Sequence, residues 1–204
     1  MSSAANRAVS PRVEDTHRAL LDAARSHITR YGYRRTSMQA VAREAGVSRA
    51  ALYLHFENKE ALFRSLANEL QDQIYFAAKE AAGTDLSLTE KLAAIFQAKM
   101  GAWGALLDST EHGSELTDEN NRLCGDLSAK SGARFRRLLA SVIRDANKAK
   151  QIDLRAVALS VDAAVGLVLA AVMGIEACAG GRLSPAVYRR ELSRMLAVIV
   201  RGLR

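Results

Sequence analysis

Cysteine, proline and long apolar runs are all scarce in this chain of 204 residues. Two cysteines, Cys124 and Cys178, are too few for a disulfide framework, so we expect reduced thiols. We expect no signal peptide, because residues 1–15 contain no apolar core. The longest apolar run, Ala163–Ile175, is too short to span a bilayer. These scarcities predict a cytoplasmic protein without a membrane partner.

The two prolines, Pro11 and Pro185, each follow a serine. A serine that caps and a proline in the first turn are typical of a helix start. Strand-forming residues are also sparse, whereas Ala, Leu, Arg and Glu are abundant. The chain is 49% hydrophobic, which is enough for a sizeable core. We therefore predict an all-α fold of about nine helices.

Positive charge is concentrated near the N-terminus of the chain. Residues 1–65 contain eleven Lys and Arg against six Asp and Glu, which gives +5 of the total of +7. The remaining residues carry 18 positive and 16 negative side chains, which gives +2. This uneven distribution favours an acidic partner of the first third, such as nucleic acid or anionic lipid.

Residues 1–10 are expected to form a flexible arm, and the loop at residues 83–85 is a candidate boundary between two functions. Thr36 and Gln39 fit a capping box that opens a short helix. Residues 109–121 are polar, and we expect them to be irregular. Asp153 is expected to cap an apolar helix that runs to about Cys178.

The chain contains only fragments of the motifs that catalytic or metal sites require. Residues 46–50 resemble a G-x-S-x-G nucleophile elbow, but that elbow needs a preceding strand, and the residues before Gly46 have a helical pattern. Glu14 and His17 match half of a di-iron motif, and a bundle site needs a second such motif. His112 and Glu115 lack a third ligand nearby. We expect neither a catalytic residue nor a metal or other cofactor.

Residues 36–63 have the pattern of a helix-turn-helix. The first short helix ends at Gly46, which can adopt the positive φ of a tight turn, and Ser48 can cap the second helix. Ala42 is small enough for close approach of the two helices. The apolar positions that would hold the pair together are Val41, Val47, Leu52 and Phe56.

Such a pair of helices can read DNA. The second helix would present Ser48, Arg49, Ala50 and Tyr53 to the major groove, where arginine can bond guanine and alanine can touch a thymine methyl. Phosphates would be held by the hydroxyl of Thr36 or Ser37, by Tyr53, His55 and Lys59, and by the start of the helix that opens at Asn58. Gln39 could equally cap its helix or reach a base. The alternative is that Tyr53 and His55 lie at the core edge and Lys59 is a solvated charge.

These residues resemble the tetracycline-repressor (TetR) family of bacterial transcription regulators. The resemblance lies in Gly32-Tyr33, Thr36–Ala42, Gly46-Val47-Ser48, Leu52–Phe56 and Asn58–Leu62, and it is close over residues 11–65. It implies a DNA-binding domain at residues 11–65 and a ligand-binding and dimerisation domain at residues 66–204. The implied protein is a homodimeric regulator that releases a palindromic operator when a small molecule binds the second domain. The resemblance also implies the phosphate contacts named above and base contacts from Gln39, Ser48, Arg49 and Ala50. Position 51, often threonine in relatives, is alanine here.

The C-terminal domain is consistent with this resemblance. Its last two helices are rich in Ala and Gly, which lets helices pack closely, as in a bundle shared by two subunits. The large apolar residues of this domain could line a mainly apolar pocket, which would favour a hydrophobic or aromatic effector. Alternatively, they could simply fill the core. The candidate lining residues are Phe96, Met100, Trp103, Leu107, Phe135 and Met173.

Some alternatives remain open at this stage. Arg7 and Arg12 in the basic arm could reach a minor groove or belong to a disordered tail. Redox sensing by Cys124 or Cys178 is a further option. The alternative to a DNA-binding repressor is a helical ligand-binding or enzymatic protein with a vestigial DNA-binding head.

Overall fold

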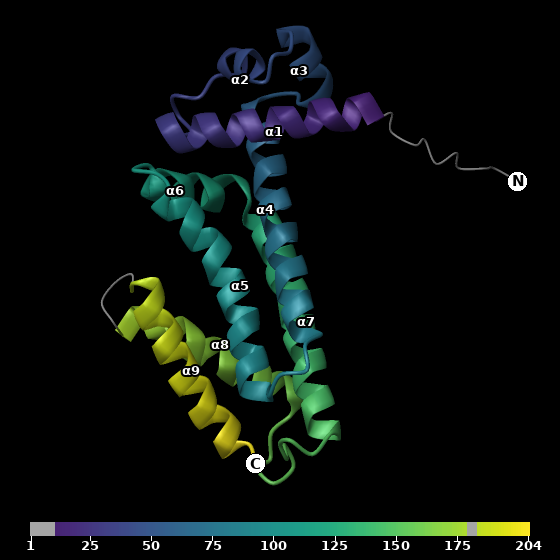
Figure 1. Ribbon diagram of the computed structural model, residues 1–204, viewed down its shortest axis with the longest axis vertical. Coiled ribbons are helices and arrows are strands. Elements are labelled where there is room, and N and C mark those ends of the chain that lie inside the picture. Colours follow the sequence, from purple (N-terminus) through teal and green to yellow (C-terminus); the bar gives the residue numbers. More distant parts are fainter. Residues whose placement is uncertain (1–10, 179–182) are drawn as a thin grey trace, which may run out of the picture. The chain divides into compact units, whose positions relative to one another are not determined.

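The computed structural model describes residues 11–178 and 183–204, and these residues form nine helices and no strand (Figure 1). The all-α prediction is therefore confirmed. The helices are α1 (Pro11–Tyr31), α2 (Met38–Glu44), α3 (Arg49–His55), α4 (Lys59–Ala82), α5 (Leu88–Asp108), α6 (Gly113–Leu123), α7 (Gly125–Lys148), α8 (Val161–Cys178) and α9 (Pro185–Gly202).

The chain divides into two compact units. The first runs to Leu70 and also includes Ala105–Gly125, so it contains α6 as well as the N-terminal helices. The second comprises Gln71–Gly104 and Asp126–Arg204. A functional boundary between residues 65 and 66 stays a prediction. The predicted arm, residues 1–10, and the side chain of Arg12 lie outside the described residues.

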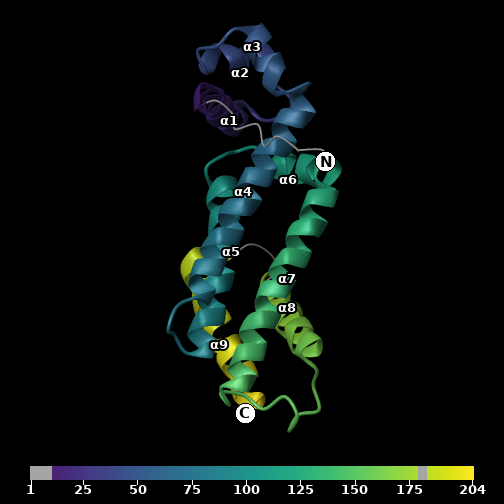
Figure 2. The same ribbon diagram turned by 90° about the vertical axis from the view of Figure 1, so that its right-hand side faces the viewer.

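In the first unit, α2 and α3 lie together on one side of α1 (Figures 1 and 2). The apolar stripe of α1 is buried, including Leu20, Ala24 and Ile28, because a helix places residues three or four apart on one face. Val41 of α2 and Leu52 of α3 are also fully buried. Of the four apolar residues predicted to hold the two short helices, Val41, Leu52 and Phe56 are thus buried, whereas Val47 is only half-buried.

The second unit has its own core, formed by α5, α7, α8 and α9. The rings of Phe96 in α5 and Phe135 in α7 meet edge to face, with centroids 5.6 Å apart. Helix α8 packs against α9, where Leu192 and Leu196 are fully buried. Ser184 caps α9 by accepting a hydrogen bond from the Val187 N–H at 3.4 Å, as its sequence predicts.

Helix α6 corrects the expectation of an irregular segment at residues 109–121. The segment folds as a helix from Gly113 because its apolar Leu116 finds a buried place in the first unit. His112, at the N-cap, makes no side-chain capping bond. The start of this helix therefore lacks a capping side chain, although Glu115 lies in its first turn.

The start of α8 is a second correction. Asp153 caps no long helix, because its carboxylate accepts the N–H groups of Arg155 at 3.0 Å and Ala156 at 3.2 Å and so closes a turn. Ala158 then adopts a φ of 52°, which interrupts a right-handed helix. The capping residue of α8 is Ser160, which accepts the Ala163 N–H at 3.1 Å.

Candidate nucleic-acid interface and ligand region

The turn between α2 and α3 is built on Gly46. Its φ is +68°, the left-handed region that glycine enters without steric cost. The Gly46 N–H donates to the carbonyl of Arg43 at 3.2 Å, and the Val47 N–H donates to that of Ala42 at 3.0 Å. The predicted turn is confirmed, and it brings the N-terminus of α3 close to the end of α2.

Serines, rather than Thr36, cap the two short helices. Ser37 accepts the Ala40 N–H at 3.2 Å at the start of α2, and Ser48 accepts the Ala51 N–H at 3.0 Å at the start of α3. Thr36 is only 3% exposed, and its hydroxyl donates to the Gly32 carbonyl at 2.7 Å. The expected capping role of Thr36 is therefore wrong, and its hydroxyl faces the protein interior.

Gln39 lies exposed on α2. A capping box pairs the N-cap residue with the residue three positions later, which is Ala40 once Ser37 is the N-cap. The structure thus removes the capping alternative for Gln39 and leaves its amide facing solvent.

Helix α3 has one buried and several exposed positions. Leu52 is 0% exposed and anchors the helix. Ser48, Arg49, Ala50 and Tyr53 are all exposed, as a DNA-reading helix requires. The guanidinium carbon of Arg49 lies 5.5 Å from the centre of the Tyr53 ring, in a cation–π arrangement. Sequence reasoning left out Leu54, although it is the most exposed large apolar side chain of this helix at 88%.

Lys59 and His55 lie at the junction of α3 with α4. The Lys59 ammonium donates to the carbonyls of Tyr33 at 3.2 Å and Arg34 at 3.4 Å, and it lies 4.4 Å from the centre of the Tyr33 ring. The half-buried His55 ring lies 5.8 Å from that of His17. Asn58 caps α4 by accepting the Ala61 N–H at 2.8 Å. These contacts fix a positive charge and an imidazole beside the start of α4.

His17 itself is shifted away from the charged form. Burial lowers its pKa below the usual 6.5, and the neighbouring His55 lowers it further, although Glu69 acts in the opposite direction. The lowered pKa favours the neutral form of the His17 imidazole.

Acidic side chains of α6 bind the loop that follows α1. Sequence reasoning missed these contacts. Glu115 accepts the backbone N–H of Arg34 at 2.7 Å. Glu119 pairs with Arg122 at 2.8 Å and with Arg34 at 3.5 Å. The hydrogen bond from Arg122 is the main cause of a lowered pKa for Glu119. The loop that supports Lys59 is therefore itself tied to α6.

The six predicted pocket residues do not share one environment. Phe96 and Phe135 are buried against each other, and Met100 is half-buried beside that cluster. Leu107 belongs to the first unit, and Met173 is 75% exposed on α8. The side chain of Trp103 lies outside the described residues. Of the five whose side chains the structure describes, three lie together.

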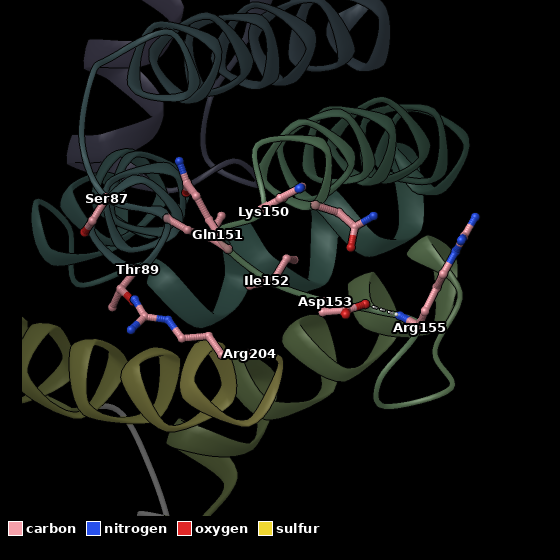
Figure 3. Close-up of a pocket in the computed structure, with 10 residues that line it drawn as sticks. Ser87, Thr89, Lys150, Gln151, Ile152, Asp153, Arg155 and Arg204 are labelled. Atoms are coloured by element: carbon pink, nitrogen blue, oxygen red, sulfur yellow. Dashed lines mark hydrogen bonds between the residues drawn. The ribbon is translucent and has the colours of Figure 1, made fainter.

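A separate open cavity of about 980 Å³ lies in the second unit (Figure 3). Its lining is mostly polar and includes Ser87, Lys150, Asp153, Arg155 and Arg204. None of the five predicted pocket residues with described side chains borders it. Among the residues that the structure describes, no three metal-ligating side chains gather, and no helix is long and apolar enough to cross a membrane.

Comparisons with known proteins agree with this geometry. A model of the bacterial regulatory proteins of the tetR family matches residues 20–66, which span most of α1 through the start of α4. The A-factor receptor protein of Streptomyces griseus is 27% identical over 135 residues, which cover 55% of this chain and 48% of the relative. An HTH-type transcriptional repressor of Mycobacterium tuberculosis is 38% identical over 64 residues, 29% of this chain and 34% of the relative.

These two curated matches therefore span only about half and a third of the relatives' own lengths. Similarity of fold extends further. A solved structure described as a TetR-family transcriptional regulator, from Rhodococcus, superposes with a TM-score of 0.67 at 21% identity. The match covers 92% of this chain and 99% of that one.

Proposed function

We propose that this chain, which belongs to the tetR family of bacterial regulatory proteins, is a homodimeric repressor that releases a palindromic DNA operator when a small molecule binds. The family and both named relatives are regulators or receptors, not enzymes by name. The observation that carries the proposal is α3, a short capped helix with a buried anchor and an exposed outer face. The protein would act in the cytoplasm, where its DNA is.

Base edges would be met by the exposed residues of α2 and α3. Ser48 and Ala50 are small, so the α3 backbone can approach the floor of the major groove. Arg49 can donate to guanine O6 and N7, and Gln39, free of a capping role, can reach an adjacent base. These contacts would decide which sequences are bound.

Phosphates would be held around the rim of the same helices. Tyr53, His55 and Ser37 offer hydroxyl and imidazole donors. The Lys59 ammonium already rests on two carbonyl oxygens, which orients it at the start of α4 without neutralising its charge. Thr36 would act through the backbone that it braces, because its own hydroxyl is buried.

A second copy of the chain would bind through α8 and α9. Leu167 and Met173 of α8 and Val198 of α9 are large apolar residues that are at least half exposed in the single chain. Covering them would remove apolar surface from water, which favours association. Two-fold symmetry would then place two α3 helices about one DNA turn apart and select a palindrome.

The effector would bind in the second unit, beside Phe96, Met100 and Phe135. These three residues form an apolar and aromatic cluster, which favours a hydrophobic or aromatic ligand. The name of the receptor from Streptomyces griseus is consistent with a family member that binds a ligand. Effector binding would favour one tilt of α4, and DNA binding would favour a different tilt. The effector would therefore lower the affinity for DNA, and DNA would lower the affinity for the effector.

The first test measures DNA binding. The full chain would be used to select duplexes from a random pool, and affinity for the selected duplex would be followed by fluorescence anisotropy over a range of salt concentrations. We expect a steep salt dependence, because counterions are released from the phosphates. Shallow dependence and no enriched palindrome would instead favour a ligand-binding or enzymatic protein with a vestigial head.

Point variants assign the contacts. Lys59→Ala and Tyr53→Phe should weaken binding to all sequences, whereas Arg49→Ala should change base preference. Arg144→Ala, at an exposed position of α7 in the second unit, is the matched control for loss of a positive charge. Unchanged affinity in both the Lys59 and Tyr53 variants would refute the assignment of these residues.

The coupling is tested with cross-linked dimers. Cysteine pairs that fix the separation of the two DNA-binding heads should lock the dimer in a state that either binds or rejects the selected duplex. A panel of apolar and aromatic compounds, screened by thermal shift, supplies the effector. Equal DNA affinity and an intact effector response in both locked forms would contradict the tilting of α4.

A further inference from the structure

The outward face of α3 is centred on two apolar residues. An α-helix advances by about 100° per residue, so residues two positions before and after a buried residue lie about 160° from it. Leu52 is the buried residue of α3, and those two positions are Ala50 and Leu54. By the same geometry Arg49 lies only about 60° from Leu52, and Tyr53 about 100°. The polar residues therefore flank the face, and the apolar pair occupies its centre.

Ala50 and Leu54 form a single patch. Side chains on a helix lean toward its N-terminus, so Leu54 covers the turn that carries Ala50. Leu54 is 88% exposed, and Ala50 is exposed as well. The Arg49 guanidinium is drawn aside over the Tyr53 ring, with its carbon 5.5 Å from the ring centre. Nothing polar on α3 thus covers the middle of its outer face.

The chemistry of the major groove determines what such a patch can recognise. Base edges there present hydrogen-bond donors and acceptors, and the C5 methyl of thymine is their apolar group. We propose that Leu54, together with Ala50, selects thymine in each half-site by packing against this methyl group. This inference rests on the proposed function, because it requires α3 to enter the major groove.

The expected size of the effect follows from the area of one methyl group. Burying one such group stabilises by about 0.8 kcal/mol, which corresponds to about 4-fold in affinity. A dimer on a palindrome makes the contact twice, so loss of both methyl groups should weaken binding about 15-fold. A change of this size is well within the range of anisotropy titrations.

The test removes the methyl group and nothing else. Each thymine of the selected duplex is replaced in turn by deoxyuridine, in both half-sites together, which keeps the base pair and its hydrogen bonds. For the unmodified protein, we expect one or two thymine positions per half-site to show the loss of about 15-fold. The remaining thymines should show little change.

Variants then connect the loss to Leu54. With Leu54→Ala, thymine and uracil duplexes should bind almost equally at the sensitive position. Leu54→Met keeps an apolar side chain of similar volume and should retain the discrimination. Lys59→Ala should weaken both duplexes by the same factor, since a phosphate contact does not distinguish the bases. Because Leu54 is exposed, circular dichroism should show unchanged helix content in its variants.

Two results would overturn the inference while leaving the proposed function intact. One is tight binding to the selected duplex with no sensitivity to uracil at any thymine. The other is a uracil penalty that Leu54→Ala leaves unchanged. A change in self-association of Leu54→Ala, seen by sedimentation with an unaltered uracil profile, would assign Leu54 to a protein contact. Failure to bind any duplex would instead refute the proposed function itself.

Discussion

Replacing Gly32 by alanine should destabilise the first unit more than the same replacement at Gly46. Both glycines have a left-handed backbone, with φ of +81° and +68°. An alanine in this region costs about 1–2 kcal/mol at either position, so the backbone term is shared. The two sites differ in what the added methyl group would meet.

At Gly32 the new Cβ would lie 2.5 Å from Glu115 Oε2 and 3.2 Å from the Cγ of His112. At Gly46 nothing lies within 4 Å. Glu115 would have to move, although its other oxygen accepts the Arg34 N–H at 2.7 Å. A hydrogen bond to a charged group contributes about 1.5–3 kcal/mol, and the exposed setting here favours the lower end. Gly32→Ala should therefore cost about 1.5 kcal/mol more than Gly46→Ala.

Urea unfolding followed by circular dichroism measures both costs, and a Glu115→Ala background completes a double-mutant cycle. Removing the Glu115 carboxylate should remove most of the extra cost of Gly32→Ala and leave only what the 3.2 Å approach to His112 adds. Equal costs of the two replacements in the native background would refute the steric argument. An extra cost of Gly32→Ala that is undiminished in the Glu115→Ala background would refute the role of this carboxylate.

Three further predictions concern charge and capping. Burial and His55 lower the pKa of His17, so the unfolded chain binds more protons than the folded one. The free energy of unfolding should therefore fall as pH drops below about 6.5, and melting curves of His17→Phe should show a weaker dependence on pH. Burial likewise lowers the pKa of Lys99, so the free energy of unfolding should rise as pH increases toward about 10.4. The urea midpoint of Lys99→Met should lack this rise. Asn58→Ala should cost about 1 kcal/mol in urea unfolding by removing the α4 cap, whereas Asn121→Ala, at an exposed position of α6, should cost little.

Local signals were sufficient to predict most of the fold. Gly46 and Ser48 act within four residues of themselves, so their turn and cap follow from short stretches of sequence. Helix α6 could not be predicted in this way. Its stability comes from Leu116, which is buried by residues distant in the chain, and its start has no capping side chain. Tertiary packing, which a single sequence does not show, decides such a segment.

The candidate interface depends on direction as well as residue type. Residue chemistry alone does not reveal that the Arg49 guanidinium leans over the Tyr53 ring or that the Thr36 hydroxyl donates to a buried carbonyl. Once a single residue of a two-turn helix is known to be buried, the direction of every other residue follows from the helical repeat. Taking Leu52 as that residue places Leu54 opposite the core without any reference to its chemistry. An exposed leucine is easily dismissed as incidental on an ordinary surface, but at the centre of the face with which α3 is proposed to enter the groove it would contact whatever the helix reads.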